Sequence, residues 1–298
     1  MNDFLNLYQN LPTHIDPIAL RLGPFSVGWY SLMYLAGFLA VYFLLLYRIR
    51  SEEFKASTKD LNETQLRSIV LDFLFYVFIG LLIGARSGYV LFYDFSFFWN
   101  NPIAIFSPYD SISHEFVGIY GMSFHGGLLG VLAASYFFLK KYGVGFWRWA
   151  DFIVPTIPAG YFFGRIGNFL NGELYGRITG KFWGMYFLDE NGRTFILLRH
   201  PSQLYEALAE GLLLFLILWP IRNQPYLKRK MLALYLIGYS IARIGVEFFR
   251  EPDEQIGFIL GFLTLGQLLS ALMLLAGLAI FFLQKSTPPH QDKAMGKL

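Results

Sequence analysis

The feature that most constrains this chain is an apolar run, residues 25–47, without a single charged side chain. It reads FSVGWYSLMYLAGFLAVYFLLLY. A helix of about 20 apolar residues is long enough to cross a bilayer. The run therefore predicts a transmembrane helix. The residues before it contain one basic side chain, Arg21, which does not resemble the start of a cleavable signal peptide.

The rest of the chain supports a membrane protein. Only 15% of the 298 residues are charged and 55% are hydrophobic, whereas soluble domains carry roughly 25% charged residues. We predict an all-α polytopic membrane protein with about seven transmembrane helices. The expected spans are 25–47, 68–92, 121–139, 149–170, 203–219, 231–249 and 262–283.

The basic residues predict the orientation. Of the 24 Lys and Arg residues, 15 fall in the segments 48–67, 140–148, 220–230 and 284–298, and 6 fall on the other side of the predicted membrane. Cytoplasmic segments carry the excess of basic residues. We therefore expect the N-terminus outside, the C-terminus in the cytoplasm, and a location in the bacterial cytoplasmic (inner) membrane.

The connections suggest one membrane domain, 1–298, with three accessory parts. Residues 93–120 are aromatic and lack Lys and Arg, so we expect an outer arm along the membrane interface. Residues 171–202 form an expected outer head, with a small hairpin around DENGR. Residues 284–298 form a cytoplasmic tail.

The chain contains no cysteine, which excludes disulfides, a cysteine nucleophile and thiolate metal sites. We expect no metal ion and no cofactor. The net charge of +3 reflects topology and gives no reason to expect nucleic acid as a partner.

Charged side chains inside the predicted spans are the strongest functional signal. An ionisable residue at mid-span costs about 2.5–3.5 kcal/mol on insertion scales, so it usually faces a partner or a wet cavity. A structural ion pair would explain any one of them, but eight together indicate a polar interior. They are Asp72, Arg86, Asp151, Arg165, Glu206, Glu210, Arg243 and Glu247.

The sixth span has a polar stripe. Tyr239, Arg243, Glu247 and Arg250 are spaced by four, four and three residues, which places them on one helix face. An intrahelical pair between Arg243 and Glu247 is the simple explanation. Two arginines on one stripe also suit a phosphate, because the guanidinium fork matches its geometry.

The fourth span ends in a second polar cluster, within GRIGNFLNGELYG at 164–176. We expect Gly160 and Gly164 to pack against a neighbouring helix. The polar members could be ordinary helix capping, but clustering with an arginine and several glycines favours a site. They are Arg165, Asn168, Asn171 and Glu173.

This block resembles the signature of the bacterial phosphatidylglycerol–prolipoprotein diacylglyceryl transferases. The resemblance covers nearly the whole chain except 177–198 and the tail. Further blocks similar to the family follow in the family's order: GWYSLMYLAGF, GYVLFYD, GMSFHGGLLG, RHPSQLYEALAEG and GYSIARIGVEFFREPD.

The resemblance implies transfer of the diacylglyceryl group of phosphatidylglycerol to the lipobox cysteine of a preprolipoprotein, with release of glycerol phosphate. The expected partners are thus phosphatidylglycerol, a lipobox signal peptide and the bilayer. It implies Arg165 and Arg243 as catalytic groups at the phosphate. It further implies substrate-binding roles for Tyr30, Asn168, Asn171, Glu173, Gly176, Tyr239, Glu247 and Arg250.

His125, in GMSFHGGLLG, is the third catalytic candidate. It could be an ordinary polar residue at a helix start, but the family block favours a function. A neutral imidazole can accept the thiol proton. Alternatively it shapes the pocket while an arginine lowers the thiol pKa.

Three other classes are less favoured. A lipid transporter or scramblase would use the buried charges as a pathway, but it predicts an inverted repeat that the sequence lacks. An intramembrane protease would need a serine or paired-aspartate motif. Ser123 suggests a serine hydrolase, but no G-x-S-x-G elbow surrounds it.

Overall fold

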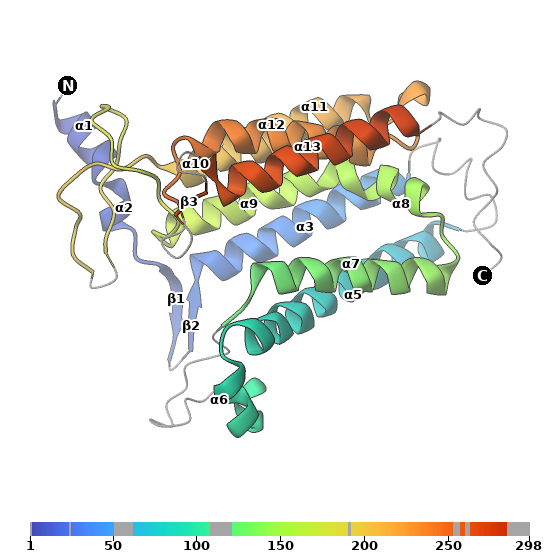
Figure 1. Cartoon of the computed structure of the whole chain (residues 1–298), viewed down its shortest axis with the longest axis horizontal. Coiled ribbons are helices and arrows are strands. Elements are labelled where there is room, and N and C mark those ends of the chain that lie inside the picture. Colours follow the sequence, from blue (N-terminus) through green and yellow to red (C-terminus); the bar gives the residue numbers. More distant parts are fainter. Residues whose placement is uncertain are drawn as a thin grey trace. The chain divides into compact units, whose positions relative to one another are not determined.

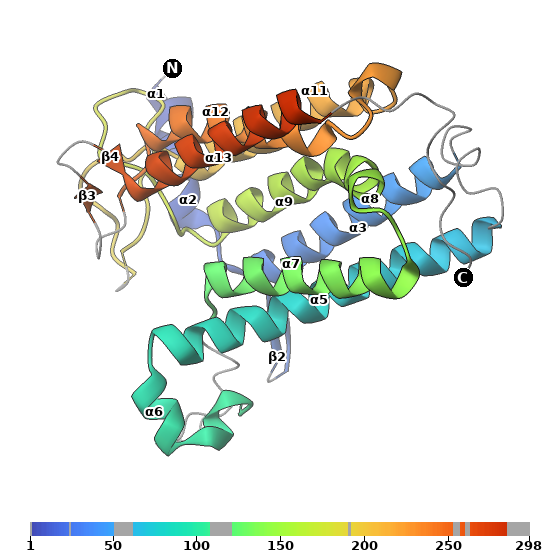
Figure 2. The ribbon, with the colours of Figure 1, turned by 45° about the vertical axis from the view of Figure 1, so that its right-hand side comes forward.

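The computed structural model describes residues 2–23, 25–50, 62–107, 121–189, 192–252, 257–259 and 263–284. These residues are predominantly helical (Figures 1 and 2). The chain divides into two compact units. The first comprises residues 1–48 and 147–292, and the second comprises residues 49–146 and 293–298.

The first unit contains two antiparallel strand pairs, several short helices and a set of longer helices. Its elements are α1 (Asn2–Gln9), α2 (Leu11–His14), β1 (Ile18–Leu22), β2 (Phe25–Gly28), α3 (Trp29–Ile49), α8 (Phe146–Ile153), η2 (Val154–Thr156), α9 (Ile157–Leu170), α10 (Ser202–Glu206), η3 (Ala207–Leu213), α11 (Leu214–Ile221), η4 (Pro225–Leu227), α12 (Met231–Glu247), β3 (Phe258–Ile259), β4 (Leu263–Thr264) and α13 (Leu265–Leu283).

The second unit is built on one pair of long helices. Its elements are α5 (Glu63–Phe92), α6 (Phe95–Asn100), η1 (Pro102–Ile105) and α7 (Phe124–Tyr142).

Helices occupy all seven ranges in which we predict spans. Among the described residues, four helices are long and apolar enough to cross a bilayer by length and composition: α3, α5, the continuous helix α10–η3–α11, and α13. The other three ranges hold shorter or more polar helices. The polytopic membrane class is thus supported by four helices of the seven.

The first predicted span starts too early. Residues 25–28 form β2, which pairs antiparallel with β1, and the helix begins only at Trp29. The apolar run contains both elements because hydropathy alone does not separate a strand from the helix that follows it.

The fourth predicted span is interrupted. α8 ends at Ile153, a single 3₁₀ turn follows at 154–156, and α9 starts at Ile157. Pro155 lies in this turn, where it cannot donate a backbone hydrogen bond.

Helix α9 packs closely on α3. A Cβ on Gly37 of α3 would lie 3.1 Å from the carbonyl oxygen of Gly160, so the predicted packing role of Gly160 is confirmed. The same prediction for Gly164 is wrong, because a Cβ there would meet open space. Gly164 lies one turn further along α9, where no atom of another element approaches its Cβ position.

Helix α10–η3–α11 contains a π-helical segment, 207–213, between two α-helical parts. At Gly211 it approaches α9 so closely that a Cβ would lie 2.8 Å from Cα of Phe162. Such wide turns are often found at functional sites. Here the wide turn follows Glu206 and includes Glu210, two carboxylates of the candidate site.

Helices α12 and α13 lie side by side in both views (Figures 1 and 2). Asp151 of α8 fixes the start of α12, since its carboxylate accepts the backbone N–H of Met231 at 3.1 Å and also that of Arg229. The structure thus gives Asp151 a capping role.

In the second unit, α5 and α7 meet along glycines (Figure 2). A Cβ on Gly84 would lie 2.7 Å from Cα of Gly130, and one on Gly88 would lie 2.8 Å from Cα of Gly126. This spacing of four residues on each helix is the small-residue pattern of membrane helix pairs.

Two partly buried charges of this unit also have structural partners. Arg86 donates to the carbonyls of Ala104 at 2.7 Å and Ile105 at 2.8 Å, and so ties η1 to α5. The carboxylate of Asp72 accepts the hydroxyl of Tyr142 on α7. For these two residues, a structural role is sufficient.

The described residues on either side of 190–191 pair with each other, as the hairpin predicted around DENGR requires. Leu188 and Thr194 form an antiparallel bridge, and Asp189 N–H donates to Arg193 O at 2.8 Å. The predicted tail, 284–298, lies outside the described residues from 285 onwards.

Candidate active site

The centre of the candidate site is the carboxylate of Glu206, the last residue of α10, which is completely buried. Three arginines reach it. Nε of Arg165 and Nη1 of Arg243 each lie 2.9 Å from Oε2, and Nη1 of Arg250 lies 3.4 Å from Oε1. These arginines come from α9, from α12 and from the segment after α12. Glu206 therefore joins three parts of the first unit.

Arg165 is held by its own helix as well. Its Nε donates to the hydroxyl of Tyr161 at 2.8 Å, and its Nη1 donates to Oδ1 of Asn168 at 3.2 Å. The guanidinium carbon lies 4.8 Å from the centroid of the Tyr161 ring. Spacings of four and three residues put all three side chains on one face of α9.

Arg243 is held by three carboxylates. Besides Glu206, its Nη1 lies 3.6 Å from Oε1 of Glu210, and its Nη2 lies 3.0 Å from Oε2 of Glu247. The predicted intrahelical pair between Arg243 and Glu247 is therefore confirmed. Glu210 has no exposed surface.

Two tyrosines complete the cluster. The hydroxyl of Tyr161 lies 2.5 Å from Oε2 of Glu210 and 3.3 Å from Oε2 of Glu206. The ring of Tyr239 stands edge-on to the Tyr161 ring, with centroids 5.7 Å apart. Tyr239 thus reaches the charged groups through Tyr161.

Exposure differs between the two kinds of charge. The side chains of Arg165, Arg243 and Arg250 keep 17%, 12% and 14% of their surface, whereas those of Glu206 and Glu210 keep none. The carboxylates hold the arginines from the buried side. Arginines oriented in this way can stabilise a developing anion such as a leaving phosphate.

A second chain of hydrogen bonds continues from Arg165 past the end of α9. Oδ1 of Asn168 accepts a hydrogen bond from Arg165, and Nδ2 of Asn168 donates to Oε1 of Glu173 at 2.7 Å. Gln203 of α10 donates to the backbone carbonyl of Glu173 at 2.6 Å. Asn171 instead caps α9, with its N–H donating to Gly167 O at 3.0 Å.

Gly176 lies in a crowded crossing of backbones. Its N–H donates to His200 O at 2.8 Å, and a Cβ at this position would lie 2.9 Å from the Cβ of His200. Arg199 donates to the carbonyl of Gly176 at 3.1 Å. Only glycine fits this crossing, which links residue 176 to Arg250 through an antiparallel bridge.

Tyr30 lies at the start of α3. Its hydroxyl donates to that of Tyr34 at 3.0 Å, and a Cβ on Gly167 would lie 3.5 Å from its ring. The charges of Arg165 and Glu173 are near enough to act on its hydroxyl.

His125 belongs to the second unit. It is exposed in the first turn of α7, and its ring stands edge-on to that of Phe124 at 5.6 Å. Ser123 is the N-cap of the same helix, because its hydroxyl oxygen accepts the Gly126 N–H at 3.3 Å. A capping role accounts for Ser123.

Sequence comparison places the chain among known proteins. Residues 17–283 match the prolipoprotein diacylglyceryl transferase family. Three relatives carry the name phosphatidylglycerol–prolipoprotein diacylglyceryl transferase. That of Chlorobaculum tepidum is 42% identical and covers 99% of each chain. That of Acinetobacter baumannii strain ACICU is 46% identical over 89% of this chain and 91% of its own, and that of Legionella pneumophila strain Lens is 42% identical over 91% and 98%.

The chain belongs to the prolipoprotein diacylglyceryl transferase family.

Three residues of this cluster are not among the site residues predicted from the sequence. They are Tyr161, Glu206 and Glu210. The two glutamates carry a visible signal, since they are carboxylates inside a predicted span and belong to the block RHPSQLYEALAEG. Tyr161 carries a weaker one, its position four residues before Arg165 on the same helix.

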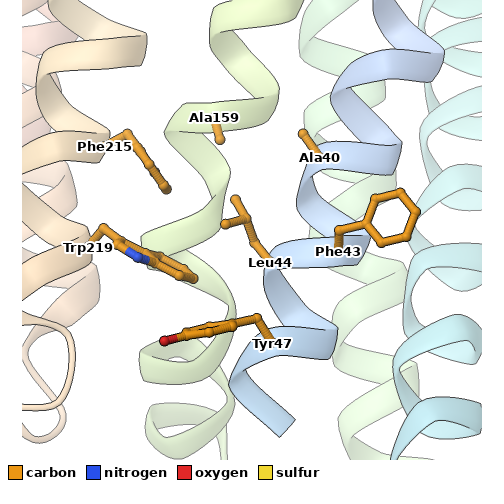
Figure 3. Close-up of a pocket in the computed structure, with 7 residues that line it drawn as sticks. All are labelled: Ala40, Phe43, Leu44, Tyr47, Ala159, Phe215 and Trp219. Carbon is orange, nitrogen blue, oxygen red and sulfur yellow. The ribbon is translucent and has the colours of Figure 1, made fainter. Parts of the chain in front are cut away.

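The transferase also has an apolar groove apart from the charged cluster. Figure 3 shows aromatic side chains of α3 and α11 facing each other across α9. The rings of Tyr47 and Trp219 are 5.9 Å apart, and the guanidinium of Arg222 lies 4.0 Å from the Trp219 ring centroid. The groove is lined by Ala40, Phe43, Leu44, Tyr47, Ala159, Phe215 and Trp219.

Proposed function

We propose that this protein transfers the diacylglyceryl group of phosphatidylglycerol to the thiol of the lipobox cysteine in a preprolipoprotein. The single observation that carries this proposal is the shared carboxylate of Glu206, which holds Arg165 and Arg243 at 2.9 Å each while both keep some exposed surface. Family membership and the names of the relatives agree with it.

The reaction requires a displacement at a glycerol carbon. The cysteine sulfur forms a bond to that carbon, and the bond from the carbon to the phosphate oxygen breaks. The products are a thioether and glycerol phosphate. In the overall reaction the thiol proton ends on the released glycerol phosphate. Because negative charge grows on the departing phosphate, oriented guanidinium groups lower the barrier.

In this mechanism, Arg165 and Arg243 act on the phosphate. Glu247 orients Arg243 directly, and Tyr239 supports the cluster through Tyr161. Arg250 adds a third positive charge at Glu206. Asn168 and Glu173 hold the glycerol head, and the further proposed substrate-binding residues are Tyr30, Asn171 and Gly176.

His125 is the proposed base. A thiol has an ordinary pKa of about 8.5, so near neutral pH it must lose a proton before it attacks. A neutral imidazole exposed at the start of α7 can accept that proton.

The proposed setting is the bacterial cytoplasmic membrane. The single membrane domain crosses the bilayer seven times, with the N-terminus outside and the C-terminus in the cytoplasm. The proposed outer arm is the aromatic segment 93–120, of which residues 108–120 lie outside the described residues, and the proposed outer head is 171–202. Exposed side chains of α6 and η1 support the arm, since Trp99 and Ile103 are 74% and 82% exposed.

The test uses purified protein, phosphatidylglycerol vesicles and a synthetic lipobox peptide. Mass spectrometry should show the peptide gaining one diacylglyceryl group, and glycerol phosphate should appear in equal amount. The matched control is the same peptide with serine in place of the lipobox cysteine. Lipid movement across the vesicles without any covalent product would contradict the proposal and favour a lipid transporter.

A further inference from the structure

The start of α13 contacts the charged cluster through Glu247. The two oxygens of this buried carboxylate have different partners. Oε2 lies 3.0 Å from Nη2 of Arg243, and Oε1 accepts the hydroxyl of Thr264 at 3.0 Å. Glu247 ends α12, whereas Thr264 is the N-cap of α13. The carboxylate therefore connects Arg243 to a second helix.

The hydroxyl of Thr264 is committed to this contact. Its oxygen accepts the backbone N–H of Gln267 at 3.2 Å, and its own hydrogen goes to Glu247. The side-chain oxygen of Gln267 accepts the backbone N–H of Thr264 at 3.1 Å, which completes a capping box. Thr264 is 2% exposed, so water does not compete for its hydrogen.

Gly266 leaves room for the carboxylate. A Cβ at this position would lie 2.6 Å from Oε1 and 2.8 Å from Oε2 of Glu247. Contacts below 3.0 Å force a neighbour to move, and the neighbour here is the carboxylate itself. The first turn of α13 also presents the positive end of its helix dipole to this negative group.

We propose that Thr264 and Gly266 are positioning residues for the transfer reaction, and that they aim Arg243 by holding Glu247. An ion pair four residues apart within one helix is weak by itself at a surface. The contact from α13 fixes the far side of the carboxylate. Glu206 pairs with Nη1 and Glu247 pairs with Nη2, so carboxylates lie beside both terminal nitrogens of the Arg243 guanidinium. This inference rests on the proposed function, because it assigns Arg243 to the leaving phosphate.

The first test compares Thr264→Val with Thr264→Ser. Valine has nearly the shape of threonine and lacks the donor, whereas serine keeps it. Small displacements of an aligned group can cost up to about 100-fold in rate. We expect the valine variant to lower kcat about 10-fold or more with little change in KM for phosphatidylglycerol, and the serine variant to retain most of kcat. Equal rates for parent and valine variant would overturn the proposal.

Gly266→Ala provides an independent variant, because its Cβ displaces the carboxylate directly. The matched control is Gly277→Ala in the same helix, whose Cβ would meet Ile237 of α12 at 3.0 Å and does not touch the cluster. We expect the control to lower the melting temperature while kcat of the folded protein stays at the parent value. A loss of kcat in both variants would mean that α13 matters only for packing.

A double variant distinguishes action through Glu247 from general damage. If Thr264 acts through Glu247, adding Thr264→Val to Glu247→Gln should cause little further loss in single-turnover rate. Losses that multiply would contradict the proposal.

A last measurement does not depend on activity. Modification of Arg243 by phenylglyoxal, followed by mass spectrometry, should be faster in Thr264→Val than in the parent, and an unchanged rate would overturn the inference. An inactive parent chain would instead refute the proposed function.

Discussion

Arg165 and Arg243 lie 2.9 Å from the same carboxylate oxygen of Glu206, although they belong to different helices. Because Glu206 is fully buried, its negative charge is balanced by these arginines and not by water. Glu206 is therefore as important to the site as the arginines that would contact the phosphate.

Glu206→Gln should destabilise the protein and abolish transfer. The change keeps the shape of the side chain and removes the charge that balances three arginines. Breaking a buried ion pair from one side costs about 3–5 kcal/mol. Chemical unfolding in detergent should show this loss. The control is Glu251→Gln, whose side chain pairs with Arg199 but is 46% exposed, and it should cost about 0–1 kcal/mol. Comparable losses for both variants would refute the central role of Glu206.

Arg165→Lys and Arg243→Lys should each leave the fold intact and lower kcat about 10²–10³-fold, the usual effect of losing one donor to a developing oxyanion. Lysine keeps the charge but lacks the fork that contacts several partners at once. Arg21→Lys is the control, because Arg21 pairs with Asp16 at an exposed position. Near-normal transfer by both cluster variants would show that neither arginine stabilises the leaving group.

His125→Gln should be slow at pH 7 and recover as the pH approaches the thiol's own pKa of about 8.5. Glutamine keeps hydrogen bonding but takes up no proton near neutrality, and a general base contributes about 10²–10⁴-fold. Single-turnover transfer from pH 6 to 9 measures the ratio of variant to parent. A ratio that stays constant across this range would exclude His125 as the base.

The segment 171–202, the proposed outer head, should lose stability as the pH falls below about 6.5. Burial, and secondly the charge of Lys181, lower the pKa of His200 from its ordinary value. Between that lowered pKa and about 6.5, the unfolded chain binds more protons than the folded one, so the free energy of unfolding decreases with decreasing pH. Amide hydrogen exchange in the 176–200 region should become faster over this window. His200→Gln should weaken the dependence, and an identical pH dependence in that variant would disprove the assignment.

The orientation of the chain can be tested by cysteine labelling, since no native cysteine interferes. Ser57→Cys lies in the predicted cytoplasmic segment 48–67. An impermeant maleimide should label it only after the cells are opened. Labelling in intact cells would reverse the predicted topology.

Local patterns predicted the parts of the site that lie on one helix. The Arg243–Glu247 pair follows from a spacing of four residues, and Arg165 and Asn168, which are three residues apart, belong to the polar cluster predicted at the end of the fourth span. The helices themselves follow from apolar runs of sufficient length, except where β2 extends the first run and a proline turn divides the fourth.

Long-range partners could not be predicted in the same way. Nothing in the local sequence around Glu206 shows that it joins α9 to α12, because this depends on how separate helices pack. The π-helical turn beside it and the contact between Thr264 and Glu247 are further results of packing. Gly164 shows that local spacing can also predict a contact that does not form. Its spacing matches a packing motif, but no other element approaches its Cβ position.

The shared carboxylate of Glu206 also has a consequence for biosynthesis. A chain is made from its N-terminus, so the predicted fourth span, which includes α9 and Arg165, is synthesised before Glu206, and Arg243 follows after both. An unpaired arginine at mid-span costs about 2.5–3.5 kcal/mol on insertion scales. The insertion cost of Arg165 is thus uncompensated until Glu206 is made and pairs with it. Arg243 then joins the same carboxylate. The order in which these three charges leave the ribosome is therefore also the order in which the bundle can become electrically balanced.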